Sequence, residues 1–399
     1  MGRARSLATN DVVESTDILV IGAGLFGLTT AIEARRRGAS VRVIEAGRLP
    51  HPHAASTDIS KVVRMDYGAD ADYTELMERG LPAWREWNER ANEVLYHEVG
   101  LLALAHEPLA PGGFEFESER LLTARGHALQ SLTESDLARD YPALAPGAFR
   151  AGYFNPNAGW AAARAVIQVL AREARAAGVR ITEHAPVRTL VERGGRVVGA
   201  KCATGRTLEA DVTVVAAGAW TPALLPELTD RLRVTAQPVV HFRAPRGAAL
   251  RSPALPVWTA DIARTGWYGF PANDEDVLKV GHHGAGSAWD PTSGRDLPDG
   301  EELRFREMLQ ANFPALAGAD LVEGRVCLYC DSVDGDFWID HHAEREGLFV
   351  AAGGSGHAFK FAPLLGELAA DALLDRRPHP RFRWRSTDTL RADVARSRD

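Results

Sequence analysis

Apolar runs and turn residues alternate along the chain in patterns that predict strands and helices. In residues 17–47, an apolar strand is followed by glycines in the spacing G-x-G-x-x-G, then by a helix and a second apolar strand. The glycines are Gly22, Gly24 and Gly27. Because both strands and the helix flank these glycines, the segment predicts a dinucleotide-binding βαβ unit.

Four residues of this unit stand where a dinucleotide would bind. Gly22 is expected to form a tight turn, Gly24 to let the backbone approach a pyrophosphate, and Gly27 to allow close packing of the helix. The first amides of the helix would then face the phosphates. Glu45 ends the second strand, about 20 residues further on, where a carboxylate can accept hydrogen bonds from ribose hydroxyls.

A second group of elements returns to the same fold later in the chain. Residues 161–178 have helical apolar spacing, and residues 187–220 contain a meander whose last strand ends in the small residues AAGAW. Residues 348–361 give another buried strand and a glycine-rich turn, and a final helix follows. A Rossmann-type unit interrupted by a meander is typical of flavoproteins with two dinucleotide-binding segments, so both segments are expected to meet FAD.

The stretch between these groups has a different character. Residues 236–326 carry alternating or aromatic runs separated by Pro, Gly and Asp, as expected for antiparallel strands of a separate substrate domain. We therefore predict an α/β fold in which a Rossmann-like FAD domain, with a parallel sheet plus β-meander, is interleaved with an α+β substrate domain built on an antiparallel sheet. The predicted parts are an FAD-binding domain at 17–95, 155–235 and 327–380, a substrate domain at 96–154 and 236–326, a disordered N-terminal extension at 1–16 and a C-terminal tail at 381–399.

Composition argues against several classes of protein. The 399 residues are 45% hydrophobic and 25% charged, and the formal charge of -7 lacks the basic excess that a nucleic-acid partner requires. We expect no membrane span, because no apolar run reaches about 18 residues.

Three cysteines cannot build a disulfide framework, which indicates a reducing, cytoplasmic location. Gly2 and Ser6 match a myristoylation pattern that is short enough to arise often by chance.

Two of the cysteines, Cys327 and Cys330, stand three positions apart before a run of acids. A zinc site would need about two further ligands at metal spacing, and the adjacent His341 and His342 do not provide them. We therefore expect no metal. A redox disulfide stays open, although the usual thioredoxin-like strand-to-helix turn is missing. The third interpretation is a covalent handle for a bound group.

Six separated motifs cover nearly the whole chain, from Asp17 to about Leu374. In this order, they resemble the sarcosine-oxidase group of D-amino-acid-oxidase-like flavoproteins. This group includes N-methyl amino acid oxidases, fungal saccharopine oxidases and fructosyl amino acid oxidases (amadoriases). The motifs are GAGLFG, STDISKVVRMDYG, NAGWAAARAV, WYGFPANDEDVLKVGHH, VCLYCDSVDGDFWIDHH and GGSGHAFKF.

The resemblance implies which residues hold the cofactor. In that group, a Cys followed by one residue and a Tyr carries the flavin through a thioether to its 8α-methyl carbon, and Cys327 matches this Cys. Such a bond prevents loss of FAD and favours its oxidising form. Cys330 would then be a packing residue. The other matching contacts to FAD are Ala217, Gly218, Gly354, Gly356, His357, Phe359 and Lys360.

The resemblance also implies an electropositive site. Lys61 matches a basic residue over one flavin face, Arg64 matches one that binds a substrate carboxylate, and Lys360 completes that clamp. Lys279 matches a lysine near flavin N5, where its charge favours electron transfer to O2. These cations stand among apolar residues, as in KVVR and FKF, which is unusual for exposed surface cations.

Two ring-bearing residues complete the expected site. His283 matches an active-site histidine and Tyr268 an aromatic beside the substrate, although a packing role fits each nearly as well. Lys61 stands where sarcosine oxidases carry Arg, as in the amadoriase and saccharopine-oxidase branches, so we expect a substrate larger than sarcosine. His282 and Ala358 depart from the residues usual in the group, which leaves the identity of the substrate open.

Together these features predict an FAD-dependent amine oxidase. Its substrate would be a small secondary amine with a carboxylate: an N-methyl, cyclic, saccharopine-like or fructosyl amino acid. The neutral amine would lose a Cα hydride to flavin N5, the imine would hydrolyse or cyclise, and O2 would become H2O2. Alternatives of the same fold are an amine dehydrogenase and a biosynthetic imine-forming oxidase. A flavin monooxygenase and a non-enzymatic FAD-binding protein are alternatives of other classes.

Overall fold

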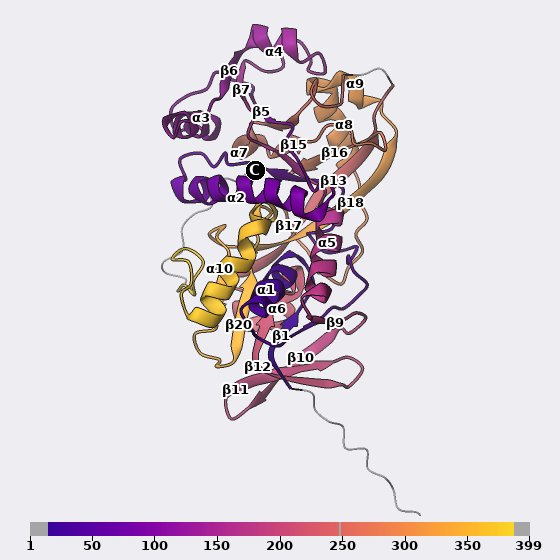
Figure 1. Cartoon of the computed structure of the whole chain (residues 1–399). Coiled ribbons are helices and arrows are strands. Elements are labelled where there is room, and N and C mark those ends of the chain that lie inside the picture. The colour runs from indigo at the N-terminus through magenta and orange to yellow at the C-terminus, as the bar shows by residue number, and fades with distance from the viewer. Residues whose placement is uncertain (1–14, 247–248, 387–399) are drawn as a thin grey trace, which may run out of the picture.

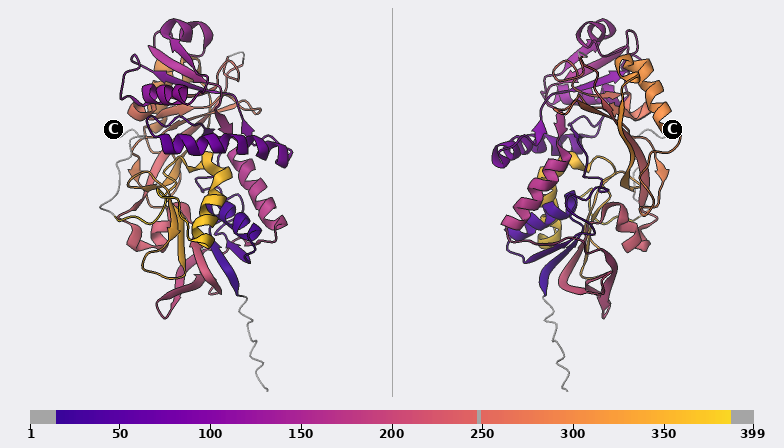
Figure 2. Two further views of the ribbon diagram at one scale, coloured as in Figure 1. Left: turned by 60° about the vertical axis from the view of Figure 1, so that its left-hand side comes forward. Right: turned by 90° about the vertical axis from the view of Figure 1, so that its right-hand side faces the viewer.

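Two large β-sheets, one in the lower half and one in the upper half of Figure 1, organise the fold. The structure is a computed structural model and describes residues 15–246 and 249–386. The lower sheet has eight strands, the upper sheet nine, and a third sheet has three. In both views of Figure 2 the long helix α2 (Ala71–Ala91) keeps its place between the halves.

The lower sheet has a parallel centre with antiparallel additions. Strand β1 lies between β12 and β2 and is parallel to both, β9 continues beyond β2, and β20 pairs in parallel with β12. Strands β10 and β11 form an antiparallel meander that joins β12, and β19 is antiparallel to β20. The strands are β1 (Thr16–Ile21), β2 (Val41–Ile44), β9 (Arg180–Thr182), β10 (Val187–Arg193), β11 (Arg196–Cys202), β12 (Thr207–Val215), β19 (Trp338–His341) and β20 (Leu348–Ala352).

Strand β1 shows why its sequence is a continuous apolar run. Ile18 and Val20 belong to the core that includes the helices α1 (Leu25–Arg36), α5 (Ala163–Ala176) and α10 (Ala362–Asp375). Leu19 and Ile21 belong to a second core on the opposite face of the sheet. A parallel strand covered on both faces needs apolar side chains at every position.

The upper sheet is antiparallel apart from one pair, β5 and β14, whose strands run in the same direction. Strand β13 is its longest and pairs with β16, β17 and β18. The strands are β5 (Leu101–Ala105), β6 (Gln130–Thr133), β7 (Ala151–Asn155), β13 (Leu232–Arg243), β14 (Val257–Ala260), β15 (Trp267–Gly269), β16 (Val277–His282), β17 (Ser287–Ala288) and β18 (Leu321–Ser332). The predicted fold class is confirmed. The parallel pair differs from the prediction, and its strands come from the two separate segments of the predicted substrate domain.

The small third sheet fixes two predicted site residues. It contains β3 (Lys61–Val63), β8 (Gly159–Ala161) and β4 (Tyr96–His97). Lys61 begins β3 and Arg64 follows it directly, so the pairing of β3 with β8 determines the position of both cations. The remaining helices are α3 (Phe114–Ala124), α4 (Glu134–Asp140), α6 (Thr221–Leu224), α7 (Ile262–Thr265), α8 (Glu301–Asn312) and α9 (Pro314–Ala317), with short 3-10 turns η1 (Gly218–Trp220), η2 (Pro226–Leu228) and η3 (Ala358–Phe361).

Two of the predicted domain limits fall inside strands of the upper sheet. The limit at 235/236 lies within β13 and the limit at 326/327 lies within β18, and the two strands pair along nearly their whole length. The predicted limits follow a change in composition, whereas strand pairing holds the whole of each strand in one sheet. Strand β18 therefore carries Cys327 within the upper sheet.

Both ends of the chain are described only in part. The N-terminal extension lies outside the described residues except for residues 15 and 16, and so do Gly2 and Ser6. Of the predicted C-terminal tail, residues 381–386 are described and are packed: Phe382 is fully buried, and Arg381 forms ion pairs with Asp70 and Asp336.

Candidate active site

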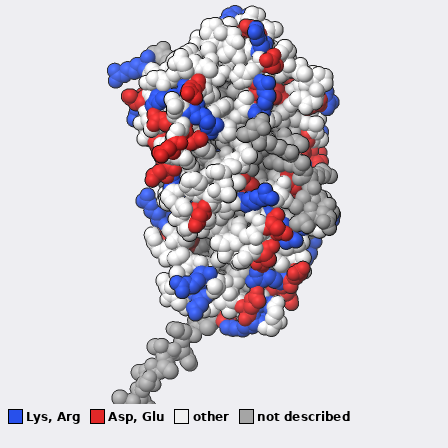
Figure 3. All heavy atoms as spheres, turned by 180° about the vertical axis from the view of Figure 1, so that it is seen from behind, with Lys and Arg blue, Asp and Glu red and all other residues white. Residues whose placement is uncertain are grey.

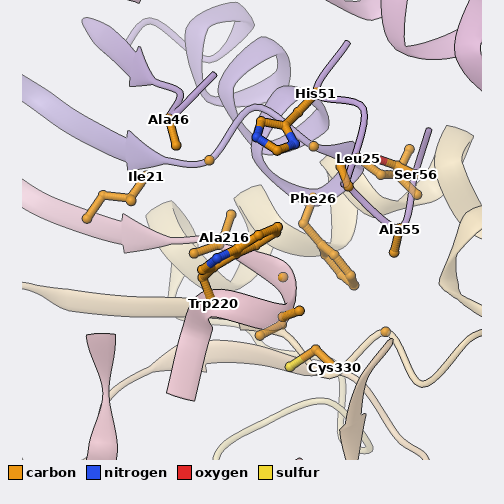
Figure 4. Close-up of a pocket in the computed structure, with 18 of the residues that line it drawn as sticks. Ile21, Leu25, Phe26, Ala46, His51, Ala55, Ser56, Ala216, Trp220 and Cys330 are labelled. Carbon is orange, nitrogen blue, oxygen red and sulfur yellow. The ribbon is translucent and has the colours of Figure 1, made fainter. Parts of the chain in front are cut away.

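A cavity of about 500 Å³ lies at the carboxyl ends of the parallel strands β1, β2, β12 and β20. This is the edge where open α/β sheets bind ligands. Figure 4 shows Leu25, Phe26 and Ser56 on one side of the cavity, with Trp220 and Cys330 on another. Predicted cofactor-binding residues that line it are Gly22, Gly24, Glu45, Ala217, Gly218, Gly354, Gly356 and Phe359.

The glycine turn after β1 has the geometry that the sequence predicts. Gly22 has φ +102°, and a Cβ there would lie 2.5 Å from the carbonyl oxygen of Ala216. At Gly27 a Cβ would lie 1.9 Å from the carbonyl oxygen of Gly22, so only glycine permits this approach of helix to turn. At Gly24 the nearest atom is Ser56 Oγ at 3.4 Å, which leaves the backbone open towards the cavity.

The start of α1 is suited to an anion. Its N-cap is Gly24, no side chain caps the helix, and its first turn contains no acid. The first amides of a helix lack partners within the helix and carry partial positive charge. Glu45 also lines the cavity, and its carboxylate accepts hydrogen bonds from the amides of Ala23 (2.8 Å) and Gly47 (3.1 Å). The cavity therefore fits a dinucleotide, with pyrophosphate at the turn and ribose at Glu45.

A second cavity, of about 70 Å³, adjoins the first. The two share Lys61, Tyr329, Gly356 and Phe359 in their linings. Predicted site residues that line the small cavity, from the third sheet, the upper sheet and the turn before α10, are Lys61, Arg64, Tyr268, His283, Gly356, His357, Phe359 and Lys360. The fold thus brings together residues that are up to about 300 positions apart in the sequence.

The small cavity is electropositive. The side chains that line it include those of Lys61, Arg64 and Lys360 and no Asp or Glu of the described chain. Arg64 is buried, and its Nη1 has no hydrogen-bond partner among the described residues. Lys360 is also buried, and its Nζ donates to Tyr67 Oη at 2.9 Å. Burial, together with the charge of Arg64, lowers the pKa of Lys360 well below its usual value.

Lys279 lies behind the small cavity and does not line it. Its side chain is fully buried, and its Nζ donates to Asp58 Oδ2 at 2.7 Å and to the carbonyl oxygen of Ser60 at 2.9 Å. The ring centres of Tyr268 and Phe270, which line the cavity, are 5.9 and 5.0 Å from Nζ. Burial lowers the pKa of Lys279 to about 8, although Asp58 opposes that shift.

Asp58 is a site residue that sequence analysis missed. Its carboxylate is fully buried and lies 2.7 Å from Lys279 Nζ, 3.7 Å from Lys61 Nζ and 3.5 Å from Arg325 Nη2. Burial raises the pKa of Asp58, but Lys279 and the other cations outweigh burial and hold that pKa well below its usual range. The available signal was an acid within the apolar segment STDISKVV, since a buried acid requires a cation.

Cys327 and Cys330 lie on opposite faces of β18, because side chains alternate along a strand. Cys330 lines the large cavity, and burial raises the pKa of its thiol to about 12. Cys327 lines neither cavity; it is buried beside Val239 and Tyr329. Tyr329, on the same face, lines both cavities.

The structure also bears on the two other interpretations of the cysteines, a zinc site and a redox disulfide. Cys202, Cys327 and Cys330 are all free thiols. In residues 15–246 and 249–386, no group of three or more His, Cys, Asp or Glu side chains is arranged to hold a metal. The redox disulfide would need both thiols of β18 to reach the same face, which a regular strand does not allow.

Charged side chains of both signs are mixed on one face of the molecule. On the face shown in Figure 3, Lys and Arg are interspersed with Asp and Glu, and no extended patch of one sign is visible. None of the helices in the described parts of the chain combines the length and apolar character needed to span a bilayer.

Comparisons with known proteins agree with the motifs. A family model described as FAD dependent oxidoreductase (DAO) matches residues 17–372. The chain is 28% identical over 363 residues to monomeric sarcosine oxidase from a Bacillus species, covering 89% of this chain and 92% of that protein. It is also 28% identical over 372 residues to N-methyl-L-tryptophan oxidase from Salmonella arizonae, covering 91% of this chain and 95% of that protein.

A solved structure with the same fold is that of fructosyl amine:oxygen oxidoreductase (Amadoriase I) from Aspergillus fumigatus. It matches with a TM-score of 0.78 at 26% identity and covers 96% of this chain and 95% of that chain. The resemblance predicted from the six motifs is therefore confirmed.

Proposed function

Because the chain belongs to the family of FAD-dependent oxidoreductases whose model matches residues 17–372, we propose that it oxidises the C–N bond of a secondary amine carrying a carboxylate. The relatives named above are a sarcosine oxidase, an N-methyl-L-tryptophan oxidase and a fructosyl amine:oxygen oxidoreductase. The proposed electron acceptor is O2, and the proposed products are an imine and H2O2. The observation that carries this proposal is the small cationic cavity directly adjoining the large cavity that fits a dinucleotide.

Arg64 is proposed to bind the substrate carboxylate. Its guanidinium is held between rings, 5.3 Å from the centre of Tyr67 and 5.4 Å from that of Phe114. Nη1 is buried and has no partner among the described residues, so an anion in the cavity would satisfy it. Lys360 adds a second hydrogen-bond donor, and Arg grips a carboxylate with two parallel hydrogen bonds.

The same charges favour the form of the amine that can react. FAD, when bound, supplies the two-electron oxidation of the C–N bond and passes these electrons to O2. An amine must be neutral to give up those electrons, and a cavity lined by Lys61, Arg64 and Lys360 disfavours a protonated amine. Val62, Ile262 and Phe270 line the same cavity and give it apolar surface.

Lys279 is proposed to assist the reaction with O2. The lysine lies behind Tyr268 and Phe270, where its positive charge stabilises negative charge that develops on O2. In a site that excludes water, such a charge acts more strongly than it would in solution.

Cys327 is proposed as the covalent anchor for FAD. In the register of β13 with β16 and β18, Cys327 and Lys279 lie on the same face of the upper sheet. Arg325 stands two positions before Cys327 on β18, so its side chain lies on the same face. Cys330 is a poorer candidate, since burial keeps its thiol protonated.

The size of the small cavity limits the substrate. A volume of about 70 Å³ suits a compact amino acid with a small N-substituent better than a fructosyl amino acid. This favours N-methyl or cyclic amino acids, which is the opposite of the size expected from Lys61 alone.

Anaerobic reduction tests the proposal. The purified holoenzyme is mixed without O2 with N-methyl, cyclic, saccharopine-like and N-fructosyl amino acids, and loss of the flavin band near about 450 nm is followed. We expect bleaching by a compact secondary amino acid and H2O2 formation once air is admitted. Bleaching by NADPH would indicate a monooxygenase, and no bleaching by any amine would contradict the proposal. An amine dehydrogenase would bleach without forming H2O2 in air.

A further inference from the structure

A row of hydrogen bonds connects the amine of Lys360 to a backbone carbonyl outside the small cavity. Lys360 Nζ donates to Tyr67 Oη at 2.9 Å, and Tyr67 Oη lies 3.0 Å from Nδ1 of His357. The other ring nitrogen of His357, Nε2, lies 2.9 Å from the carbonyl oxygen of Gly335. We call these four groups the hydroxyl row. Lys360 and His357 line the small cavity, whereas Tyr67 is buried and lines neither cavity.

The carbonyl of Gly335 sets the direction of the hydrogen bonds in the row. A carbonyl oxygen only accepts, so Nε2 of His357 carries a proton and donates to it. In a neutral imidazole, Nδ1 then has no proton and accepts from the hydroxyl of Tyr67. That hydroxyl has one hydrogen, which is used by His357, so its oxygen is left to accept from Lys360 Nζ. All three contacts are satisfied together in this arrangement.

This arrangement determines what Lys360 can offer to a ligand. One N–H of its amine is used by Tyr67, and a lysine amine has further N–H groups that can donate to an anion in the small cavity. The backbone of Lys360 is fixed as well, because the indole of Trp84 donates to its carbonyl oxygen at 2.7 Å. With both ends of the residue held, its side chain has little freedom left to lose when an anion binds.

Tyr67 also contacts the second proposed partner of the substrate carboxylate. The guanidinium of Arg64 lies 5.3 Å from the centre of the Tyr67 ring. The ring of Tyr73 is stacked on the same ring, with centres 4.9 Å apart and 19° between the planes. Tyr67 thus touches both Arg64 and Lys360, so its position determines how the two donors stand relative to each other.

Arg381, in the C-terminal segment, holds the far end of the row. Its guanidinium pairs with Asp336, the residue after Gly335, at 2.6 Å, and with Asp70, the N-cap of α2, at 2.7 Å. The same guanidinium lies 4.3 Å from the ring centre of Tyr73, whose Oη donates to Asp336 at 2.9 Å. Arg381 therefore reaches the hydroxyl row by two routes, through the Gly335 turn and through the stacked ring of Tyr73.

Arg385 supports the same turn from the other side. Asp334 stands directly before Gly335, and its buried carboxylate accepts from Arg385 Nε at 2.9 Å. Arg385 Nη1 also donates to the carbonyl oxygen of Phe337 at 3.0 Å. The two acids beside Gly335 in the sequence thus each have an arginine of the C-terminal segment, as a buried acid requires. These pairs explain the run of acids that follows Cys330.

We propose that Tyr67 is a positioning residue that holds Lys360 and Arg64 in the geometry that binds the substrate carboxylate, and that Arg381 keeps Tyr67 in place. This rests on the proposed function, which assigns the carboxylate to these two donors. A carboxylate has two oxygens with defined lone-pair directions, so donors on two separate segments have to be aligned before it binds. Tyr67 and Arg381 act through other residues and do not touch the substrate.

The first test is Tyr67→Phe, which keeps the ring and removes only the hydroxyl. Binding of acetate to the oxidised holoenzyme is measured by calorimetry, with acetamide as an uncharged analogue of the same shape. We expect the affinity for acetate to fall about 3- to 10-fold and that for acetamide to change less than about twofold. KM for the amine should rise by a similar factor with little change in the limiting rate of anaerobic reduction, because the carboxylate contact is the same before and during the reaction.

The matched control is Tyr96→Phe. It removes a buried tyrosine hydroxyl that has no hydrogen-bond partner among the described residues. This variant should bind acetate and acetamide like the unchanged protein. Unchanged affinity for acetate in Tyr67→Phe would overturn the proposal. Equal losses for acetate and acetamide would overturn it as well, because a general disturbance of the cavity weakens both ligands alike.

A double-mutant cycle tests the role of Arg381. Arg381→Gln should weaken acetate binding about 2- to 5-fold, and Arg381→Lys, which keeps a cation between the two acids, should recover part of that loss. Tyr67→Phe combined with Arg381→Gln should bind acetate about as well as Tyr67→Phe alone, because both changes act through one hydroxyl. Losses that multiply would overturn the role of Arg381. The control is Arg377→Gln, an arginine that is 71% exposed and paired with Asp375 at 2.8 Å.

A further measurement needs no ligand. Nitrogen NMR of holoenzyme with isotope-labelled histidine reports the tautomer of His357, whose signals are assigned by their loss in His357→Gln. We expect a neutral ring with its proton on Nε2, and an Nδ1 signal that shifts in Tyr67→Phe. A proton on Nδ1 would reverse the direction of the row and overturn the proposal.

These outcomes separate the inference from the proposed function. If no amine bleaches the flavin while acetate binding still depends on the Tyr67 hydroxyl, the proposed function fails and the positioning role stands. Bleaching by an amine, together with acetate binding that is independent of this hydroxyl, gives the opposite result.

Discussion

The shape of the large cavity is determined by backbone atoms, whereas the character of the small cavity is determined by side chains. The large cavity depends on backbone: at Gly22 and Gly27 an added Cβ would lie within 2.5 Å of a carbonyl oxygen. The small cavity depends on side chains, since Lys61, Arg64 and Lys360 give it its charge. A backbone turn tolerates changes in neighbouring side chains, whereas a charge cluster depends on every member. Cofactor binding and substrate selection should therefore be separable by mutation.

The largest effect is expected at Arg64. Replacing it by Ala removes the proposed partner of the substrate carboxylate, and we expect kcat/KM for the amine to fall roughly 10²- to 10³-fold. FAD content should not change. Steady-state kinetics and the absorbance ratio of protein to flavin check both parts. The control is Arg233→Ala, at an exposed position of β13. Equal loss of FAD and activity in Arg64→Ala would show that the two cavities are not separable.

Lys279 should affect only the reaction with O2. We expect Lys279→Met to slow reoxidation about 10²-fold and to leave anaerobic reduction unchanged. Stopped-flow measurement of the two half-reactions checks this. In the unchanged protein the charge is present below a pKa of about 8 and is lost above it, so reoxidation should fall as pH rises through about 8. Lys201→Met, at an exposed position of β11, is the control. A flat pH profile in the unchanged protein would contradict the assignment.

The same lysine predicts a change in stability with pH. Its pKa in the folded protein, about 8, is below the 10.5 usual for lysine, so between these pH values the unfolded chain holds a proton that the folded chain has released. Its contribution to the free energy of unfolding should therefore rise from pH 8 to 10.5. Denaturant unfolding of the unchanged protein and of Lys279→Met compares the slopes, and identical slopes would count against the buried charge.

Gly27→Ala tests the backbone side of the comparison. The added Cβ would collide with the carbonyl oxygen of Gly22, and we expect a loss of about 1–3 kcal/mol in the free energy of unfolding, with weaker FAD binding. Thermal unfolding and FAD titration measure both. Gly24→Ala is the matched control: its Cβ meets only Ser56 Oγ at 3.4 Å, so it should weaken FAD binding and change stability by about 0.5 kcal/mol or less. Similar melting temperatures for the two variants would argue against a backbone-determined turn.

The smallest effect on activity is expected at Cys327, because FAD should stay in the large cavity without a covalent bond. Mass spectrometry of the denatured chain should show added FAD in the unchanged protein and in Cys330→Ser, and none in Cys327→Ser. Turnover by Cys327→Ser should fall about tenfold or less. An unmodified holoenzyme, or FAD lost only in Cys330→Ser, would disprove the anchor.

The fold was predictable because its signals are local. The βαβ unit, the meander and the strands of residues 236–326 each follow from a pattern within one stretch of chain, and the structure contains all of them. The predicted domain limits at 235/236 and 326/327 fall inside β13 and β18, because a strand's sheet is decided by its pairing partners and not by local composition. The parallel pairing of β5 with β14 left no local signal for the same reason.

The site was predictable in part. The motifs named every cation of the small cavity, and the glycine positions of the large one follow from the turn itself. Asp58 was missed, since its partner is distant: Asp58 meets Lys279 across 221 positions. The different surroundings of Cys327 and Cys330 also become clear only from the faces of β18.

The sequence by itself determined the glycine turn, the strand and helix pattern, and the choice of cations, because backbone conformation depends on residues close together in the chain. Only the tertiary structure decided which acid neutralises Lys279, which thiol shares a sheet face with it, and how the two cavities meet. These depend on burial and charge pairing between segments far apart in sequence, and neither exists until those segments pack.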